Sequence, residues 1–209
     1  MIDRGPDPVG VIKLVRSLPN ARVLKGNHEQ IMLDAIIGQD PLDAETWDIN
    51  GGWTTRQQLN DMEFEAYEEL VRWMATLPLY AVVETDERPY LLVHAGIQTE
   101  TARAFLLEHG VDCADGTGAV DVDRELLKQM LAVQSSDDLL WIRHGYWDAP
   151  TGLLSAEGKG PVVVSGHTPT VSLGRYCEVG GLAGLDEESG RGQIVRLGGE
   201  DTAGVPDRI

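Results

Sequence analysis

The stretch ARVLKGNHE, residues 21–29, decides the fold, because a short apolar segment runs directly into glycine, asparagine and histidine. The same arrangement occurs twice more. YLLV, residues 90–93, is followed by His94-Ala95-Gly96, and PVVVS, residues 161–165, by Gly166-His167-Thr168. Such segments are typical of the strands of an α/β sheet. Polar side chains at the carboxyl ends of these strands converge on ligands, and the adjacent glycines allow close approach of the backbone.

The residue types at the three strand ends favour a metal site. Imidazole nitrogens combined with amide or carboxylate oxygens suit Mn, Fe or Zn. A single histidine after a strand is more often a structural residue that hydrogen-bonds a neighbour. Three strand ends of the same kind make the metal site the better interpretation.

Composition excludes several classes of function. The 209 residues carry a net charge of −17, which opposes binding to the phosphate backbone of nucleic acids and to anionic lipid. A phosphorylated substrate would therefore need a local positive charge or a metal. No apolar stretch reaches membrane length and no signal peptide is present, so we predict a cytoplasmic protein. The length of the chain predicts one domain, residues 1–209. The two cysteines, Cys113 and Cys177, lack metal-type spacing and are expected to be thiols.

Periodicity predicts alternating helices and strands. A hairpin is expected from residues 80–84 and 90–93, joined by an acidic turn. Further strands are expected at 21–25, 161–165 and 193–197, and helices at 29–37, 54–59, 63–75, 101–108 and 125–133. Residues 38–52 and 110–123 are expected to be loops, and 138–142 a short apolar segment.

Five short motifs carry a specific resemblance: DRGPD at 3–7, GNHE at 26–29, HAG at 94–96, WIR at 141–143 and SGHT at 165–168. Their order and approximate spacing resemble the phosphoprotein phosphatase family of binuclear metallophosphoesterases. NGGWTT at 50–55 and LPLYAVVE at 77–84 resemble its bacterial and phage Ser/Thr phosphatases. Diadenosine tetraphosphatases are similar too, but they tend to carry aspartate where this chain has Glu29. The resemblance covers residues 1–172 and leaves 173–209 as a divergent tail.

The resemblance implies a fold and a set of residue roles. The fold would be the calcineurin-like metallophosphoesterase α/β fold: two mixed β-sheets packed face to face, with flanking helices, incomplete on its N-terminal side. His28 would be the general acid for the leaving alkoxide. Asp3 would orient His28 by accepting a hydrogen bond. Arg4 and Arg143 would bind the phosphate group. Asn27, His94 and His167 would be ligands of one divalent ion of the Mn, Fe or Zn class.

Each residue also has a simpler interpretation. Asp3 and Arg4 could form a surface ion pair, and Arg143 could be the solvent-facing end of an apolar segment. Glu29 could be a first-turn carboxylate favoured by the helix dipole, which we retain. The tryptophans are interpreted as core or loop packing.

The family's second motif, Gly-Asp-x-x-Asp-Arg-Gly, extends beyond the start of this sequence. Met1 and Ile2 occupy its x-x positions, so we expect a truncated or mis-assigned start that leaves the bridging aspartate and the upstream Asp-x-His-Gly motif outside the chain. The leading hypothesis is a phosphatase for phosphoserine and phosphothreonine, in proteins or small phosphoesters. A nucleoside polyphosphate hydrolase such as a diadenosine tetraphosphatase is the alternative, and a non-catalytic remnant is the third.

Overall fold

The computed structural model describes residues 1–38, 40–86, 88–113, 121–144, 146, 151–153 and 160–168, and the backbone of 182–183 and 194–196. The chain forms two compact units, Met1–Pro78 and Leu79–Ile209. Each unit has its own cluster of buried hydrophobic residues. Cys177 and most of the tail from residue 173 lie outside the described residues, as does the middle of the predicted loop 110–123.

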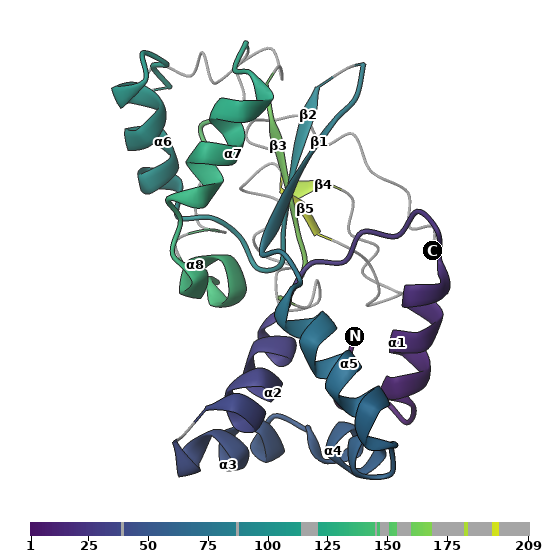
Figure 1. The fold of residues 1–209 in the computed structure, drawn as a ribbon. Coiled ribbons are helices and arrows are strands. Elements are labelled where there is room, and N and C mark those ends of the chain that lie inside the picture. Colours follow the sequence, from purple (N-terminus) through teal and green to yellow (C-terminus); the bar gives the residue numbers. More distant parts are fainter. Residues whose placement is uncertain are drawn as a thin grey trace. The chain divides into compact units, whose positions relative to one another are not determined.

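The first unit consists of helices, with bounds α1 Pro8–Ser17, α2 Asn27–Ile37, α3 Pro41–Ile49, α4 Trp53–Asn60 and α5 Phe64–Ala75 (Figure 1). Local chemistry explains where they begin. Asp7 accepts a hydrogen bond from the Gly10 N–H at the start of α1. Asp40 does the same for the Leu42 N–H at the start of α3, which also has proline at its first position. Such end caps satisfy backbone donors that a helix leaves unpaired.

Helix α3 corrects the prediction of a loop over residues 38–52. Proline and glycine are common in loops, but here Pro41 is the first residue of the helix and Gly51 and Gly52 follow its end. The N–H of Gly51 donates to the Asp48 carbonyl at 3.0 Å, and the N–H of Gly52 to the Trp47 carbonyl at 2.9 Å. With Gly51 at φ +92°, this is the Schellman arrangement of a helix end.

Residues 21–25 form no strand, contrary to the prediction. Within the described part of the chain, their backbone hydrogen bonds are confined to the ends of the segment. The Ala21 N–H donates to the Leu18 carbonyl and the Lys25 N–H to the Pro78 carbonyl. A strand needs a neighbour to pair with, and none of the described residues supplies one. Beside this segment lies a pocket of about 270 Å³, lined by Ala21 and Val23 of the segment together with Val15, Arg16, Leu18, Trp73 and Leu77.

The second unit is built on a mixed sheet with strand order β1-β2-β3-β5-β4. The bounds are β1 Tyr80–Glu84, β2 Pro89–Val93, β3 Val162–Ser165, β4 Leu182–Ala183 and β5 Ile194–Arg196. The predicted hairpin is confirmed, with Tyr80 opposite Val93 and Glu84 opposite Pro89. β2 and β3 run parallel, with Leu91 beside Val163. The carboxyl ends of these two strands therefore lie at the same edge of the sheet.

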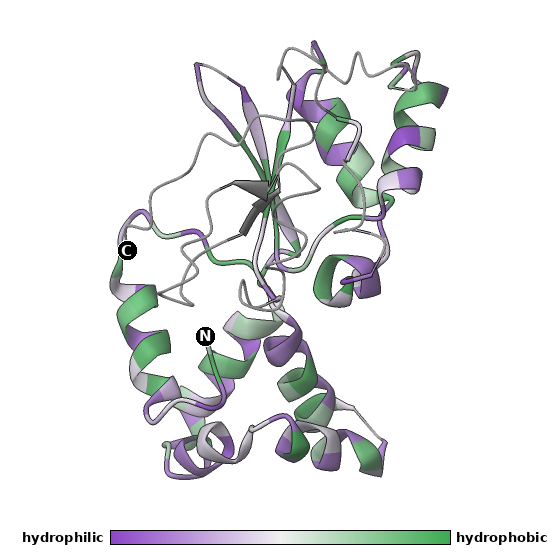
Figure 2. Cartoon of the chain, turned by 180° about the vertical axis from the view of Figure 1, so that it is seen from behind, coloured by the Kyte–Doolittle hydropathy of each residue, from purple (hydrophilic) through white to green (hydrophobic). Residues whose placement is uncertain are grey.

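Helices α6 Thr99–Glu108, α7 Arg124–Ala132 and α8 Ser136–Trp141 lie on one side of this sheet (Figure 1). Hydrophobic residues run along the strands, and the helices have hydrophobic and hydrophilic faces (Figure 2). The fully buried Leu91, Leu106, Leu127 and Leu131 belong to the core between these elements. The segment 138–142, expected only to be apolar, is mostly the helix α8, which Ser135 caps through the Asp138 N–H.

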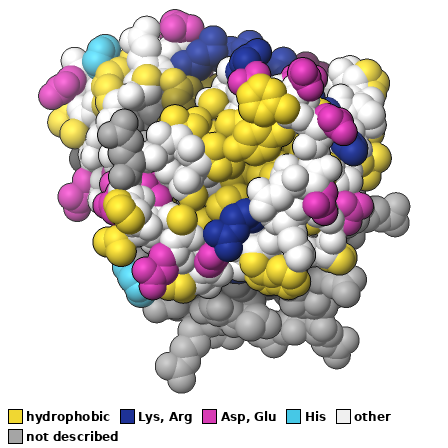
Figure 3. Space-filling model, turned by 60° about the horizontal axis from the view of Figure 1, so that its bottom comes forward, with side chains coloured by type: hydrophobic (Ala, Val, Ile, Leu, Met, Phe, Trp, Pro, Cys, Tyr) yellow, Lys and Arg dark blue, Asp and Glu magenta, His cyan; other side chains and the backbone are white. Residues whose placement is uncertain are grey.

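The predicted α/β class is confirmed. The described strands form one mixed sheet, and no second sheet is found among the residues that the structure describes. No helix in the described ranges has the length and apolarity needed to cross a membrane. In Figure 3, hydrophobic side chains gather in a hollow of the face turned forward, with Lys or Arg side chains beside it.

Candidate active site

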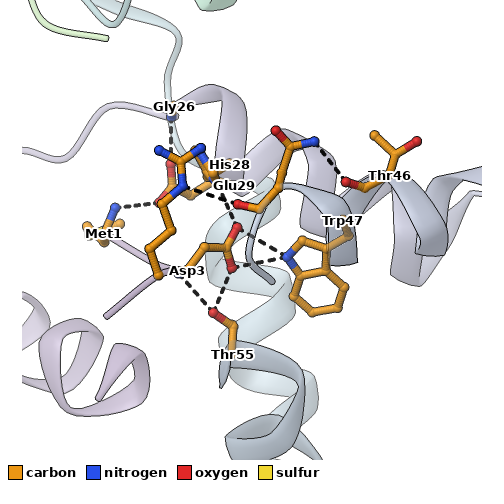
Figure 4. A network of polar contacts seen from close by, with 10 residues as sticks. Met1, Asp3, Gly26, His28, Glu29, Thr46, Trp47 and Thr55 are labelled. Carbon is orange, nitrogen blue, oxygen red and sulfur yellow. Dashed lines mark hydrogen bonds and ion pairs between the residues drawn. The ribbon is translucent and has the colours of Figure 1, made fainter. Parts of the chain in front are cut away.

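In the first unit, Asp3 and His28 form a close pair. His28 Nδ1 lies 2.6 Å from Asp3 Oδ2, and the Asp3 side chain is 0% exposed against 19% for His28 (Figure 4). An ionised carboxylate can only accept hydrogen bonds, so Nδ1 is the donor. This contact orients the imidazole and leaves its Nε2 atom for another partner. Sequence analysis paired these two residues, and the structure brings them together.

The backbone at this pair has an unusual conformation. Asp3 has φ +66° and the next residue, Arg4, has φ +57°. Left-handed conformations are uncommon outside glycine, and they persist where the surrounding structure holds them in place. The Arg4 N–H donates to the Gly51 carbonyl at 3.1 Å, and Arg4 Nε donates to the Asn50 carbonyl at 3.2 Å. The loop after α3 therefore holds Arg4, whose side chain is exposed.

Two further side chains contact the Asp3 carboxylate. Thr55 Oγ1 lies 2.7 Å from Oδ1, and Trp47 Nε1 lies 3.1 Å from Oδ1 and 3.3 Å from Oδ2. Figure 4 shows these groups gathered around Asp3. The tryptophans were interpreted as packing residues, and no role was assigned to Thr55. Thr55 belongs to the NGGWTT motif at 50–55, which is the sequence signal that could have indicated it, whereas Trp47 lies three residues before this motif.

Helix α2 carries Asn27 at its first position, with His28 and Glu29 following. Asn27 is buried. Glu29 Oε2 accepts the Gly26 N–H at 2.9 Å, as in a capping box, and Oε1 pairs with the Met1 ammonium at 2.8 Å. Burial disfavours the charged form of Glu29, but the ammonium and the backbone hydrogen bonds outweigh it, so the pKa of Glu29 lies below its usual value. The interpretation of Glu29 as a first-turn carboxylate agrees with this geometry.

In the second unit, His94 follows β2 and His167 follows β3. His94 Nε2 lies 3.2 Å from His167 Nδ1. The Gly166 N–H donates to the His94 carbonyl at 2.8 Å, which joins the two strand ends, and His167 is held at φ +63°. The convergence expected for two of the three strand ends is therefore observed.

Arg143 lies just beyond α8 and contacts the same pair. Its Nε donates to His167 Nε2 at 3.1 Å. A guanidinium cannot accept, so Nε2 is the acceptor and the ring proton of His167 lies on Nδ1, facing His94. The Trp141 ring stands edge-on to His167, with centroids 6.0 Å apart.

The histidine pair fits two ligands of one divalent ion. At a metal–nitrogen distance of about 2.0–2.1 Å and a tetrahedral angle, two ligand nitrogens are about 3.3 Å apart. The observed 3.2 Å is close to this spacing, but it is also the length of the hydrogen bond from His167 Nδ1 to His94 Nε2, so a bound ion would replace that proton. Within the described ranges, no three His, Cys, Asp or Glu side chains form a group that could hold a metal.

Comparison with known proteins identifies the family. The model of the calcineurin-like phosphoesterases matches residues 1–192. The chain belongs to this family. Members of the calcineurin-like phosphoesterase family use divalent metals, which agrees with the histidine pair of the second unit.

Three curated relatives of this calcineurin-like phosphoesterase carry two names. A symmetrical bis(5'-nucleosyl)-tetraphosphatase of Erwinia tasmaniensis is 32% identical over 46% of this chain and 31% of its own length. The one of Aeromonas hydrophila is 28% identical over 73% of this chain and 46% of its own length. Serine/threonine-protein phosphatase 1 of Salmonella typhimurium is 33% identical over 48% of this chain and 44% of its own length. The chain spans less than half the length of the curated relatives it matches.

Proposed function

We propose that this chain is a metal-dependent phosphomonoesterase that acts on phosphoserine and phosphothreonine. The observation that carries the proposal is the His28–Asp3 pair, with its 2.6 Å contact and its fully buried carboxylate. A buried acceptor on one ring nitrogen orients the imidazole and leaves the other nitrogen for a substrate. Imidazole exchanges protons near neutral pH, which suits protonation of an alkoxide leaving group.

In this proposal the other residues have the roles implied by the family resemblance. Arg4 and Arg143 bind phosphate oxygens, because a guanidinium pairs with two oxygens at once. Asn27, His94 and His167 are metal ligands. When bound, divalent ions supply hydroxide at neutral pH and offset the charge of the phosphoryl group.

Two features favour a protein phosphatase over the alternative. NGGWTT at 50–55 resembles the bacterial Ser/Thr phosphatases, and position 29 is glutamate, where diadenosine tetraphosphatases tend to carry aspartate. The specific observation for the alternative is that two of the three relatives are tetraphosphatases. Partners of this chain would be phosphoproteins or small phosphoesters. Exclusion of nucleic acid and membrane, and a cytoplasmic location, stay predictions from the charge of −17 and the sequence.

The test is Mn²⁺-dependent hydrolysis of a phosphoserine peptide by the chain and its His28→Ala variant. Loss of a general acid should lower kcat by about 10²–10⁴-fold. His109→Ala is a matched control, because His109 contacts only its own helix, through Phe105, in the described structure. Equal rates for His28→Ala and the unchanged chain would contradict the mechanism.

Two further measurements separate the alternatives. In direct competition, a large preference for diadenosine tetraphosphate over the phosphopeptide would favour the nucleotide hydrolase. Equilibrium dialysis with Mn²⁺ tests the ligands without activity, since His94→Ala and His167→Ala should each weaken binding. A chain that binds Mn²⁺ and hydrolyses neither substrate would support the non-catalytic interpretation.

A further inference from the structure

The Asp3 carboxylate is held by more than its contact with His28. Its side chain is completely buried, and three side chains donate to it: His28, Trp47 and Thr55. Trp47 is 2% exposed and Thr55 0% exposed. Burying a carboxylate in its charged form requires such donors, since water no longer solvates it. His28 supplies one of them, and Trp47 and Thr55 supply the rest.

Thr55 fixes both the backbone and the side chain of Asp3. Its Oγ1 accepts the Asp3 N–H at 2.9 Å and donates to Asp3 Oδ1 at 2.7 Å. This closed ring of hydrogen bonds holds the left-handed conformation, φ +66°, at which Asp3 presents Oδ2 to His28. Trp47 Nε1 spans both oxygens from the other helix and limits rotation of the carboxylate.

The junction between α3 and α4 brings these two donors together. Trp47 lies in the last turn of α3, and Thr55 in the first turn of α4. The glycine pair between them ends one helix and starts the next within a few residues. A Cβ at Gly52 would lie 2.2 Å from the Trp47 ring, so the indole packs directly against this junction. The segment 47–55, which includes the NGGWTT motif, thus directs the side chains of Trp47 and Thr55 at Asp3.

We propose that Trp47 and Thr55 are positioning residues for the reaction. They hold the Asp3 carboxylate so that His28 presents Nε2 in a constant direction. The inference rests on the proposed function, because it concerns the efficiency of the same proton transfer. Neither residue touches the reacting atoms in this proposal, and their effect passes through Asp3 and His28.

A purely stabilising role would have a different signature. If the two residues served only folding, their loss would lower all activities alike. A positioning role affects the step that needs a proton. p-Nitrophenolate leaves without protonation, whereas the alkoxide of serine does not, so the two leaving groups distinguish the roles.

The kinetic experiment compares Thr55→Val and Trp47→Phe with the unchanged chain on both substrates. We expect each variant to lower kcat for the phosphoserine peptide about tenfold more than kcat for p-nitrophenyl phosphate, with KM nearly constant. Thr55→Ser keeps the hydroxyl and should restore most of the loss. Equal losses on both substrates, or no rescue by Thr55→Ser, would overturn the proposal.

Matched controls lie beside each residue. Thr54→Val removes a buried hydroxyl that has no hydrogen-bond partner among the described residues. Trp53→Phe changes a tryptophan that is 58% exposed. Both should retain the leaving-group dependence of the unchanged chain. A shift in these controls as large as in Thr55→Val would also count against the proposal.

An NMR measurement tests the positioning role independently of the proposed function. In the metal-free chain, the NMR resonance of the His28 Nδ1 proton reports its hydrogen bond to Asp3 without any substrate. We expect this resonance to move or broaden in Thr55→Val and Trp47→Phe, and to stay in place in Thr54→Val. An unchanged resonance in both variants would overturn the positioning role even if the chain proved inactive. Equal activity of His28→Ala and the unchanged chain would instead overturn the proposed function.

Discussion

Substituting Gly52 by alanine should disturb the Asp3 site from a distance. The added Cβ would lie 2.2 Å from both Cδ1 and Nε1 of Trp47, whereas ordinary van der Waals contact begins at 3.4 Å. The indole must therefore move by about 1 Å or more. Its hydrogen bond to Asp3 Oδ1, now 3.1 Å long, cannot survive such a shift.

The cost of Gly52→Ala has two parts. Inserting a methyl group into a packed site costs about 1–3 kcal/mol. Losing a hydrogen bond to a buried charged group costs about 1.5–3 kcal/mol. We expect the chain to lose on the order of 3–5 kcal/mol of unfolding free energy. For a chain of this size, that corresponds to a fall in Tm of about 10 °C.

Thermal unfolding followed by near-ultraviolet circular dichroism measures this directly, because the signal includes the tryptophan environment. Gly5→Ala is the matched control. A Cβ there would meet only the Asp3 carbonyl at 3.8 Å, an ordinary contact. Its Tm should stay level or rise slightly, because alanine restricts the unfolded chain. A Gly52→Ala variant that melts within about 2 °C of the unchanged chain would refute the reasoning.

Two further substitutions test the surroundings of the site. Gly51→Ala should lower the free energy of unfolding by about 1–2 kcal/mol, because Gly51 has φ +92° and a Cβ would lie 2.9 Å from Arg4 Cγ. Urea unfolding measures this loss. Inhibition by inorganic phosphate should also weaken if Arg4 binds the phosphate. Glu29→Gln should cost about 1–2 kcal/mol near pH 7. The pKa of Glu29 is lowered in the folded state, so its stabilisation is present above the unfolded value of about 4.3 and is lost as the pH falls through the folded value. The difference between Glu29→Gln and the unchanged chain in urea unfolding should therefore shrink below about pH 4, and a difference that grows there would contradict this sign.

Local sequence rules were sufficient for most elements of this chain. The hairpin from Tyr80 to Val93 is predicted because β-branched and aromatic residues flank an acidic turn, and the structure confirms it. Helix α3 was missed because Pro41 and the glycines resemble loop residues, although proline is favoured at a helix start and glycine beyond a helix end. Residues 21–25 show the opposite error, since an apolar segment becomes a strand only where a partner pairs with it.

The sequence by itself determined the α/β class, because the patterns that indicate helices and strands are local. The motifs at the strand ends predicted that His94 and His167 lie close together, and the resemblance of DRGPD and GNHE to the family motifs implied the pairing of Asp3 with His28. Both contacts are observed, because a strand end or a short motif places its residues through local backbone geometry, and the roles of these residues stay predictions. The family predicted from the order of the motifs agrees with the family model that matches residues 1–192.

Only the tertiary structure decided what holds Asp3 in place. Trp47 and Thr55 are 44 and 52 residues away from it in the sequence, and no local rule links a carboxylate to donors so far along the chain. Their contact arises because a Schellman helix end turns α3 into α4 and directs both side chains at one buried oxygen pair. Such contacts depend on how helices pack, and packing follows from the whole set of buried surfaces in the unit, which no single motif contains.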